Sequence, residues 1–489
     1  MSLPNLRLQR GLLVVALAQG ILGDALLRSI PWGLNLFAWA LAGIAGVAVL
    51  ARRENLALPR ATPGWLAMAG CCALLVALRD APALSFLTLV AGAGCLALAA
   101  WTAQGGSPFA AAPTDFIVQG LITVLNALLG GFAWILSAIT RQHITAAETR
   151  MARTQTWVRV TVGVIAATPA LILFGSLFAA ADPVFAHGIG RMVDLDFATL
   201  ASHMALIGFW GWVCAGYGRR LLLGGEAPSR SLAPQPPVRP PVIEVLVGLG
   251  LLAALFLAFV GVQLRYLFGD DALIQATIGM TYAEYARRGF FELLGVALLL
   301  LPLLLGCDWL LGAARERRSF QALAGSLIAL LGVIMASAWK RLALYTGAYG
   351  LTESRLYAAA ALVWVTLVTL WFAATVLAGH RPRFAAGAVI AALMALGGLQ
   401  MLNPDAFIAR HNLARAREGL GCDVPHLLQL GPDAAPVLLR ELSALPEPDR
   451  DKVRETLIQR WGTSSSDWRQ WNLARIRARA AVAFQLQTP

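Results

Sequence analysis

Side chains that bind or transfer charged groups are most concentrated between residues 265 and 292 of this sequence. The group contains Arg265, Asp270, Asp271, Tyr282, Glu284, Tyr285, Arg287 and Arg288. Guanidinium groups bind phosphates and carboxylates through paired, charge-assisted hydrogen bonds, and tyrosine hydroxyls can orient the same ligands. These residue types therefore favour a site for an anionic headgroup or phosphate.

A purely structural interpretation of the same segment is also open. Thr281 followed by Glu284 is a capping box, which predicts a helix that begins there and continues into an apolar span. Glu284 then precedes Arg287 and Arg288 at the spacing of helical ion pairs. Tyrosines at such a helix end are typical of the headgroup level of a membrane.

A second polar segment spans residues 339–357. The run from Tyr349 to Thr352 predicts a turn that ends in a helix N-cap, with Glu353 in the first turn and Arg355 at the start of an apolar span. The parity of the spans places both segments on one side of the membrane. We therefore expect one basic pocket rimmed by aromatic side chains, with these ligand-binding residues: Arg265, Tyr282, Glu284, Tyr285, Arg287, Arg288, Tyr349 and Arg355.

An enzymatic alternative uses the adjacent acids of the first segment. Asp270 or Asp271 could hold a divalent ion or act as a base in a lipid-linked glycosyl or phosphoryl transferase. The 6 histidines show neither a zinc-ligand spacing nor the partners of a nucleophilic triad. The sequence therefore predicts no resident metal and no cofactor, and it favours a non-enzymatic protein over the transferase.

The composition determines which elements must position these residues. The chain has 489 residues, of which 58% are hydrophobic and 13% charged, and its mean hydropathy is +0.67. A soluble globular protein has about twice that charged fraction. The 6 cysteines are scattered, mostly inside apolar runs, which excludes a secreted disulfide scaffold. We predict an all-α, polytopic transmembrane helix bundle with a small C-terminal helical domain outside the membrane.

Apolar stretches long enough to cross a membrane recur up to residue 402. They must be helices, because lipid offers no partner for an open backbone amide. Asp308, inside one of them, is expected to face the bundle interior or the cytoplasmic rim beside Arg315. We place the stretches at residues 11–29, 32–51, 64–79, 84–102, 116–140, 160–180, 199–218, 242–264, 289–313, 319–338, 356–379 and 384–402.

The arginines between these stretches predict the orientation, because basic loops stay in the cytoplasm. The arginines at 141–159 fit this rule only if the stretch 116–140 lies in the interface or re-enters, or if the stretches 64–79 and 84–102 are divided differently. We predict about 11 crossings, with about 12 as the alternative, a cytoplasmic N-terminus and residues 403–489 outside the cytoplasm. The basic clusters lie at residues 7–10, 52–60, 141–159, 219–239, 315–318 and 381–383.

The net charge of +12 does not indicate a nucleic-acid partner. Residues 403–489 carry 12 basic and 10 acidic side chains, so most of the excess lies in loops between apolar stretches. No basic stripe with interleaved aromatic residues occurs in any polar stretch. The predicted partners are therefore membrane lipids and no nucleic acid, and the oligomeric state stays open.

Four regions follow one another along the chain. We predict an N-terminal membrane bundle at 1–222, a proline-rich linker at 223–241, a five-span bundle at 242–402 and a soluble helical domain at 403–489. Helix starts in the last domain are expected at Asn403-Pro404-Asp405, near Asp433, near Asp449 and after Ser464–Ser466. Its Trp461, Trp468 and Trp471 are expected in the core, with anchoring in the lipid interface as the alternative.

Four separated motifs, in this order, resemble a bacterial family of polytopic inner-membrane proteins known as domains of unknown function, the 4153/4173 group. The resemblance covers roughly residues 242–480, and it implies a bacterial inner membrane and a shared C-terminal half, with no activity to carry over. The motifs are Thr281 to Phe290; Ala348 to Thr352 with Arg355; Asn403 to Asp405 with Ala409, Arg410 and Asn412; and Asp467 to Arg469 with Trp471 and Asn472.

Together these observations lead to one functional hypothesis and one alternative. The hypothesis is a multi-pass bacterial inner-membrane protein whose outer pocket binds an anionic lipid or envelope precursor, acting as a transporter, scaffold or sensor. The alternative is the transferase with an acidic site at Asp270 and Asp271.

Overall fold

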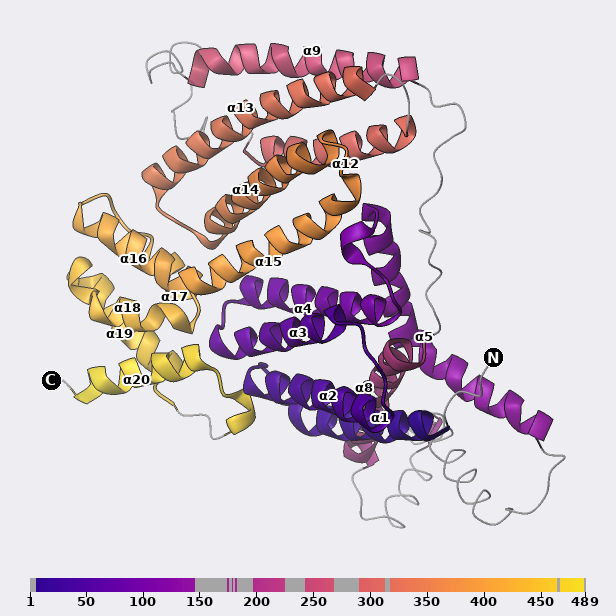
Figure 1. The fold of residues 1–489 in the computed structure, drawn as a ribbon. Helices are drawn as coiled ribbons and strands as arrows, with labels where there is room; N and C mark the ends of the chain where they lie inside the picture. Colours follow the sequence, from indigo (N-terminus) through magenta and orange to yellow (C-terminus); the bar gives the residue numbers. More distant parts are fainter. Residues whose placement is uncertain are drawn as a thin grey trace. The chain divides into compact units, whose positions relative to one another are not determined.

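The computed structural model describes residues 6–145, 174–175, 178, 181–182, 197–224, 242–267, 290–312, 317–463 and 467–487. These residues form helices and no strands, so the predicted all-α class is confirmed (Figure 1). The long helices are α1 (Leu6–Leu27), α2 (Leu34–Arg53), α3 (Ala61–Leu78), α4 (Pro82–Ala103), α5 (Pro113–Thr145), α8 (Phe197–Leu223), α9 (Val242–Leu267), α12 (Phe290–Leu311), α13 (Arg317–Tyr349), α14 (Glu353–Phe372) and α15 (Phe384–Leu402).

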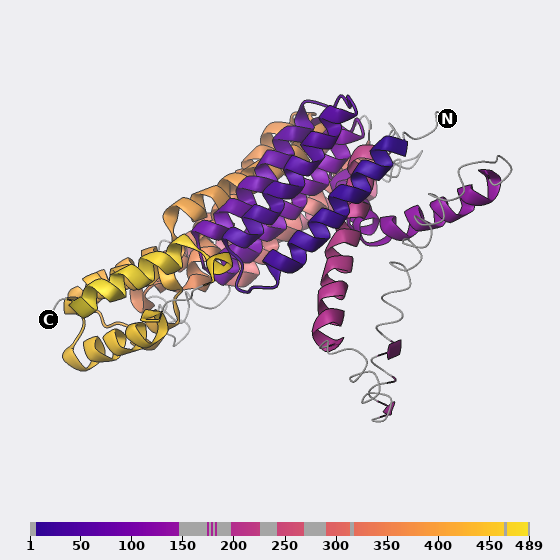
Figure 2. The same ribbon diagram turned by 90° about the horizontal axis from the view of Figure 1, so that it is seen from below.

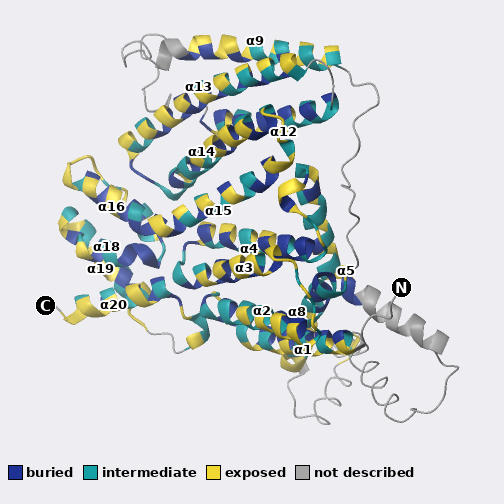
Figure 3. Cartoon of the chain, in the orientation of Figure 1, coloured by how far each residue is buried: buried dark blue, intermediate teal, exposed yellow. Residues whose placement is uncertain are grey.

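Among the described residues, 11 helices are long and apolar enough to cross a membrane. α9 illustrates why they need lipid: its exposed positions run along the helix (Figure 3) and include Ile243, Leu251 and Leu255, which are 74%, 69% and 64% exposed. In water such a surface would be an aggregation site. The chain is therefore a polytopic membrane protein.

Two of the predicted apolar stretches, 116–140 and 160–180, need separate comment. The stretch 116–140 lies within α5, a continuous helix whose part Pro113–Gly131 is long and apolar enough to cross. That it lies in the interface stays a prediction. The stretch 160–180 falls almost entirely outside the described residues.

The chain divides into two compact units whose segments interleave along the sequence. The first unit comprises Met1–Leu74, Gly92–Gly106 and Gln119–Ser229. In it α1 packs against α2 and α8, and α1 approaches α8 closely where Gly20 meets Gly211. Small residues at such crossings let helix backbones come together in lipid.

The second unit comprises Leu75–Ala91, Ser107–Val118 and Arg230–Pro489. Within it α9 packs on α13, α13 on α12 and α14, and α14 on α15 (Figure 1). Their shared core is apolar and includes Phe320, Leu327, Leu362 and Phe372, each at most 2% exposed. This bundle fixes the ends of α12, α13 and α14, where the candidate site lies.

Short helices follow α15 and gather beyond its C-terminal end (Figure 2). They enclose a second core that includes Ile408, Leu413 and Leu427. Asn403, with φ of 57°, ends α15, and the next helix begins at Pro404 as the sequence predicts. These helices are α16 (Pro404–Arg417), α17 (Val424–Gln429), η4 (Pro432–Ala434), α18 (Ala435–Arg440), η5 (Leu442–Ala444), α19 (Glu447–Trp461), η6 (Trp468–Gln470) and α20 (Leu473–Gln487).

The three tryptophans of this region do not share one environment. Trp461 packs against the apolar core, as expected. Trp468 and Trp471 are 59% and 36% exposed, so their expected burial is wrong. Both lie at or beside the short 3-10 helix η6, and neither belongs to the apolar core of this region.

The turn between α13 and α14 connects the bundle to α16. Gly350 adopts φ of +75°, a left-handed conformation that glycine tolerates without cost. The Asn412 side chain of α16 then bonds the backbone of Leu351 twice, accepting from its N–H and donating to its carbonyl, both at 2.8 Å. Thr352 caps α14 by accepting from the Arg355 N–H, which confirms the predicted N-cap.

Replacement of Gly350 with alanine should destabilise this turn. The new Cβ would lie 2.7 Å from the Asn412 Oδ1 atom, and the left-handed backbone costs a non-glycine residue about 1 kcal/mol or more. We expect the thermal unfolding midpoint of the detergent-solubilised protein to fall by several degrees, measured by tryptophan fluorescence. Gly347→Ala is the matched control, because a Cβ there meets nothing within 4 Å. Equal midpoints for the two variants would contradict the role of the turn.

Candidate functional site

Most of the residues predicted to bind a ligand lie outside the described residues: Tyr282, Glu284, Tyr285, Arg287 and Arg288. The same is true of Asp270 and Asp271, so the transferase alternative stays an untested prediction. Arg265 falls in the last turn of α9. Tyr349 and Arg355 are described, at the end of α13 and the start of α14.

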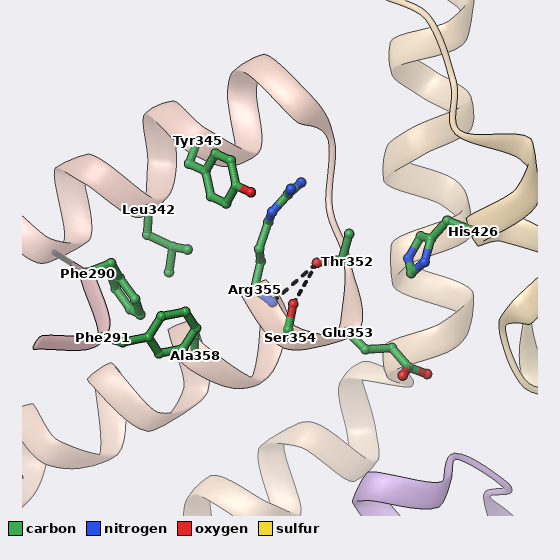
Figure 4. A pocket seen from close by; sticks show the side chains of 10 residues that line it. All are labelled: Phe290, Phe291, Leu342, Tyr345, Thr352, Glu353, Ser354, Arg355, Ala358 and His426. Carbon is green, nitrogen blue, oxygen red and sulfur yellow. Dashed lines mark hydrogen bonds between the residues drawn. The ribbon is translucent and has the colours of Figure 1, made fainter. Parts of the chain in front are cut away.

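A pocket of about 510 Å³ opens beside Arg355 at this end of the bundle (Figure 4). Its walls come from α12, α13, α14 and α17, so it joins the end of the first polar segment to the second. One part of the lining is apolar and the other is polar. The lining residues are Phe290, Phe291, Leu342, Tyr345, Thr352, Glu353, Ser354, Arg355, Ala358 and His426.

Arg355 is held by its own turn. Its Nη1 donates to the carbonyls of Tyr349, at 3.2 Å, and Gly350. The guanidinium carbon lies 3.9 Å from the centre of the Tyr345 ring, a cation–π contact. Among the described residues no acceptor is bonded to Nε or Nη2, so these N–H groups remain to bind a ligand. Nη1 thus holds the guanidinium in place, and the Nε and Nη2 side of the group is the side that can contact a ligand.

Tyr349 differs from its predicted role. Its side chain is 54% exposed and does not line the pocket, although its ring contacts that of Tyr345 at 5.3 Å. Tyr345 takes its place, with the hydroxyl pointing toward Arg355 (Figure 4). Tyr345 lies one turn earlier on α13 and lines the pocket, whereas Tyr349 is the last residue of that helix.

His426 faces the pocket from the opposite side to Tyr345 (Figure 4). It lies in α17, whose N-cap Asp423 accepts from the His426 backbone N–H at 3.1 Å. Its Nε2 atom is buried and bonds no partner among the described residues. An imidazole nitrogen in that state can donate to a ligand or accept from one, depending on its protonation.

Glu353 connects the pocket to a buried acid that sequence analysis missed as a functional group. Asp405, in the first turn of α16, is 1% exposed, and its carboxyl lies within hydrogen-bonding reach of Glu353. Neither oxygen receives a hydrogen bond of good geometry from the described residues. In the sequence Asp405 has only the pattern of a helix-start acid after Asn403 and Pro404, which gives no signal of burial.

The environment of Asp405 disfavours its charge. Burial first, and then the nearby negative charges of Glu353 and Asp433, raise its pKa to about 7, while the Gly431 N–H opposes them. Desolvation is the first of these causes because a buried carboxylate loses its water. The pKa of Asp433 is also raised by burial, although Arg79 opposes that shift.

Ion pairs surround this acid and fix the loops around it. The Arg79 Nη1 atom lies 3.0 Å from Asp433 Oδ1, and Arg475 forms a two-pronged pair with Asp80 at 2.7 and 2.9 Å. Asn403 also donates to Asp433, at 3.0 Å. Both arginines are thus bonded to other carboxylates, Arg79 to Asp433 and Arg475 to Asp80.

At the other end of the bundle, Asp308 behaves as a structural acid. It is 5% exposed and pairs with Arg381 at 3.5 Å and Arg317 at 3.8 Å. The expected partner Arg315 lies outside the described residues. Within the described part of the chain, no three His, Cys, Asp or Glu side chains are arranged to hold a metal ion.

The sequence matches the family described as a domain of unknown function (DUF4153) over residues 66–441, which is most of the chain. The chain belongs to the DUF4153 family. No curated protein and no solved structure matches it. In this DUF4153 member the pocket, Asp405 and Asp433 all fall inside the matched residues, whereas Arg475 lies beyond them.

The buried acid predicts a pH dependence of stability. Because the pKa of Asp405 is higher in the folded protein than in the unfolded chain, its stabilising contribution is full below about pH 4 and is lost as the pH rises through about 7. The full shift corresponds to at most about 4 kcal/mol. The thermal unfolding midpoint of the wild-type protein should fall as the pH rises over this range. In Asp405→Asn the midpoint should fall less.

The control for this measurement is Asp451→Asn, whose carboxylate is 72% exposed and paired only at 4.0 Å. It should keep the wild-type pH dependence. A wild-type midpoint that does not decline between about pH 5 and about pH 8 would show that Asp405 is ionised throughout.

Proposed function

We propose that this multi-pass membrane protein binds an amphiphile with an anionic headgroup, a lipid or an envelope precursor, in the pocket beside Arg355. The observation that carries the proposal is the two-sided lining of that pocket. Phe290, Phe291, Leu342 and Ala358 form the apolar part, and Arg355, Tyr345 and His426 stand in the polar part. A ligand with one apolar end and one anionic end matches this division.

The position of the pocket supports the same class of ligand. It lies where α12 begins and where α13 gives way to α14, at an end of three helices that are long and apolar enough to cross the membrane. An acyl chain could lie along Phe291, which is 65% exposed on α12, while the headgroup meets Arg355. A membrane lipid reaches such a site without leaving the bilayer.

The sequence adds further cations for the headgroup. Arg287 and Arg288 are separated from Phe290 and Phe291 of the pocket wall by Gly289 alone. Clustered arginines favour phosphate because each offers several N–H donors in a fixed fork. A role as transporter, scaffold or sensor is compatible with the pocket, and each requires the same binding step.

We propose further that the protein resides in a bacterial inner membrane with its N-terminus in the cytoplasm and the pocket on the outer side. The distribution of arginine clusters supports this orientation. Two of the arginines that lie on the proposed outer side are paired: Arg79 with Asp433 and Arg475 with Asp80. Neutralised charges contribute little to orientation.

The binding proposal predicts the effect of Arg355→Gln. Loss of a charge-assisted hydrogen bond of about 1.5–3 kcal/mol should weaken binding of dioctanoyl phosphatidylglycerol at least about tenfold. Binding of dioctanoyl phosphatidylcholine should change much less. Native mass spectrometry or thermophoresis in detergent measures both. Arg440→Gln is the matched control, because Arg440 is exposed on α18 away from the pocket.

Two outcomes would contradict this proposal. The first is equal affinity of the wild-type protein for the two lipids. The second is an unchanged affinity for phosphatidylglycerol in an Arg355→Gln variant that keeps the wild-type unfolding midpoint. Glycerol phosphate, which has the headgroup charge without acyl chains, shows whether the apolar wall is needed.

The orientation predicts that a reporter fused after Pro489 is active only outside the cytoplasm. Alkaline phosphatase, which requires an oxidising compartment for its disulfides, should be active in that fusion, and green fluorescent protein should be dark if exported unfolded. The same reporters fused after Arg53, at the end of α2, give the opposite control, because that arginine belongs to a predicted cytoplasmic cluster. A fluorescent fusion after Pro489 with inactive phosphatase would reverse the orientation.

A further inference from the structure

We propose that Asp405 and Glu353 form a proton-binding pair whose protonation strengthens the binding of an anionic headgroup in the adjacent pocket. The inference rests on the proposed function for its ligand, but the proton site itself can be tested without one. It assigns the buried acid a role in regulation of the pocket by pH.

The first support is geometric. Glu353 lines the pocket, and its carboxyl lies within hydrogen-bonding reach of Asp405. Two ionised carboxylates cannot donate to each other and repel at that range, so the arrangement favours one proton between them. Asp405 is 1% exposed and lacks a donor of good geometry among the described residues, which makes it the member that water stabilises least.

The second support is that other charges around Asp405 do not replace the proton. From η4, Asp433 adds negative charge but is paired with Arg79 at the end of α3. From α14, the Tyr357 hydroxyl oxygen accepts from the Leu84 backbone N–H, and neither carboxyl oxygen of Asp405 has a hydrogen-bond partner of good geometry among the described residues.

The pair between Asp80 and Arg475 is closed on itself, with both carboxylate oxygens of Asp80 bonded to the guanidinium. The first turn of α16 favours the ionised form of Asp405 only by about 1 kcal/mol. Burial and two neighbouring carboxylates outweigh that effect.

Coupling to the pocket follows from the shared helix start. Glu353 and Arg355 are two residues apart in the first turn of α14, so a charge on the acid pair acts directly on an anion at Arg355. Removing one negative charge close to the anion, in a partly screened environment, changes affinity by about tenfold. Linkage then requires the reverse effect: a bound anion increases proton uptake by the pair.

His426 is a second titratable group on the pocket wall, and it must be separated from the acid pair. A positive charge on its imidazole would also favour an anion in the pocket. Two variants separate the contribution of the acid pair from that of His426. Asp405→Asn should abolish the effect of the acid pair and keep that of His426, and His426→Gln should do the reverse.

The proton is tested directly by infrared spectroscopy of the ligand-free protein. The carbonyl stretch of a protonated carboxyl should be present at about pH 6 and diminish by about pH 8, on either side of the pKa of about 7. It should be missing in Asp405→Asn and unchanged in Glu447→Gln, which alters an exposed acid on α19. Wild-type spectra that match those of Asp405→Asn at both pH values would overturn the proton site, whatever the pocket binds.

Coupling is tested with dioctanoyl phosphatidylglycerol at the same two pH values. The wild-type protein should bind this lipid about fivefold to tenfold more tightly at the lower pH, and Asp405→Asn should lose most of that difference while binding tightly at both. An equal pH dependence in the two proteins would overturn the coupling while leaving the binding proposal intact. Failure of the wild-type protein to prefer this lipid over phosphatidylcholine at either pH would instead refute the binding proposal, and the coupling with it.

Discussion

The ion pair between Arg79 and Asp433 is the interaction on which the described site depends. It joins residues 354 positions apart in sequence, at the end of α3 and in η4. Arg79 also donates to the Gln400 carbonyl at 3.1 Å, at the end of α15. One guanidinium therefore holds the last membrane helix and the C-terminal helices together. A buried pair of this kind adds little net stability over apolar packing, but removal of either partner leaves the other charge buried and unpaired. Asp433 also acts on Asp405, because its negative charge raises the pKa of that carboxyl.

Arginines at this end of the second unit share a second structural task. Arg415, 9% exposed, donates to the carbonyls of Gly347 and Ala348, and Arg355 donates to those of Tyr349 and Gly350. These carbonyls end α13 and have no partner within the helix. Cations placed there also complement the helix dipole. A count of arginines in loops treats such residues as free charges, whereas the structure uses them to close a helix end.

Local signals in the sequence were sufficient for the elements but not for the site. The Thr352 cap and the helix start at Pro404 follow from residue type and position alone, and the structure has both. The burial of Asp405 has no local signal, because it arises from Gly431 and Asp433, which are distant in sequence. The exchange of Tyr349 for Tyr345 has a different origin. A turn was predicted to begin at Tyr349, but α13 continues to that residue and directs its side chain outward.

The start of α14 shows how one short motif can serve two requirements. Thr352 caps the helix, Glu353 contacts the buried acid of α16, and Arg355 lines the pocket. Residues two apart in the first turn of a helix point to different sides, so the acid and the cation need not neutralise each other. The cap fixes the backbone that carries both. A shift of this turn would therefore change the charge at the pocket and the contact with α16 together, which is the physical requirement for coupling between them.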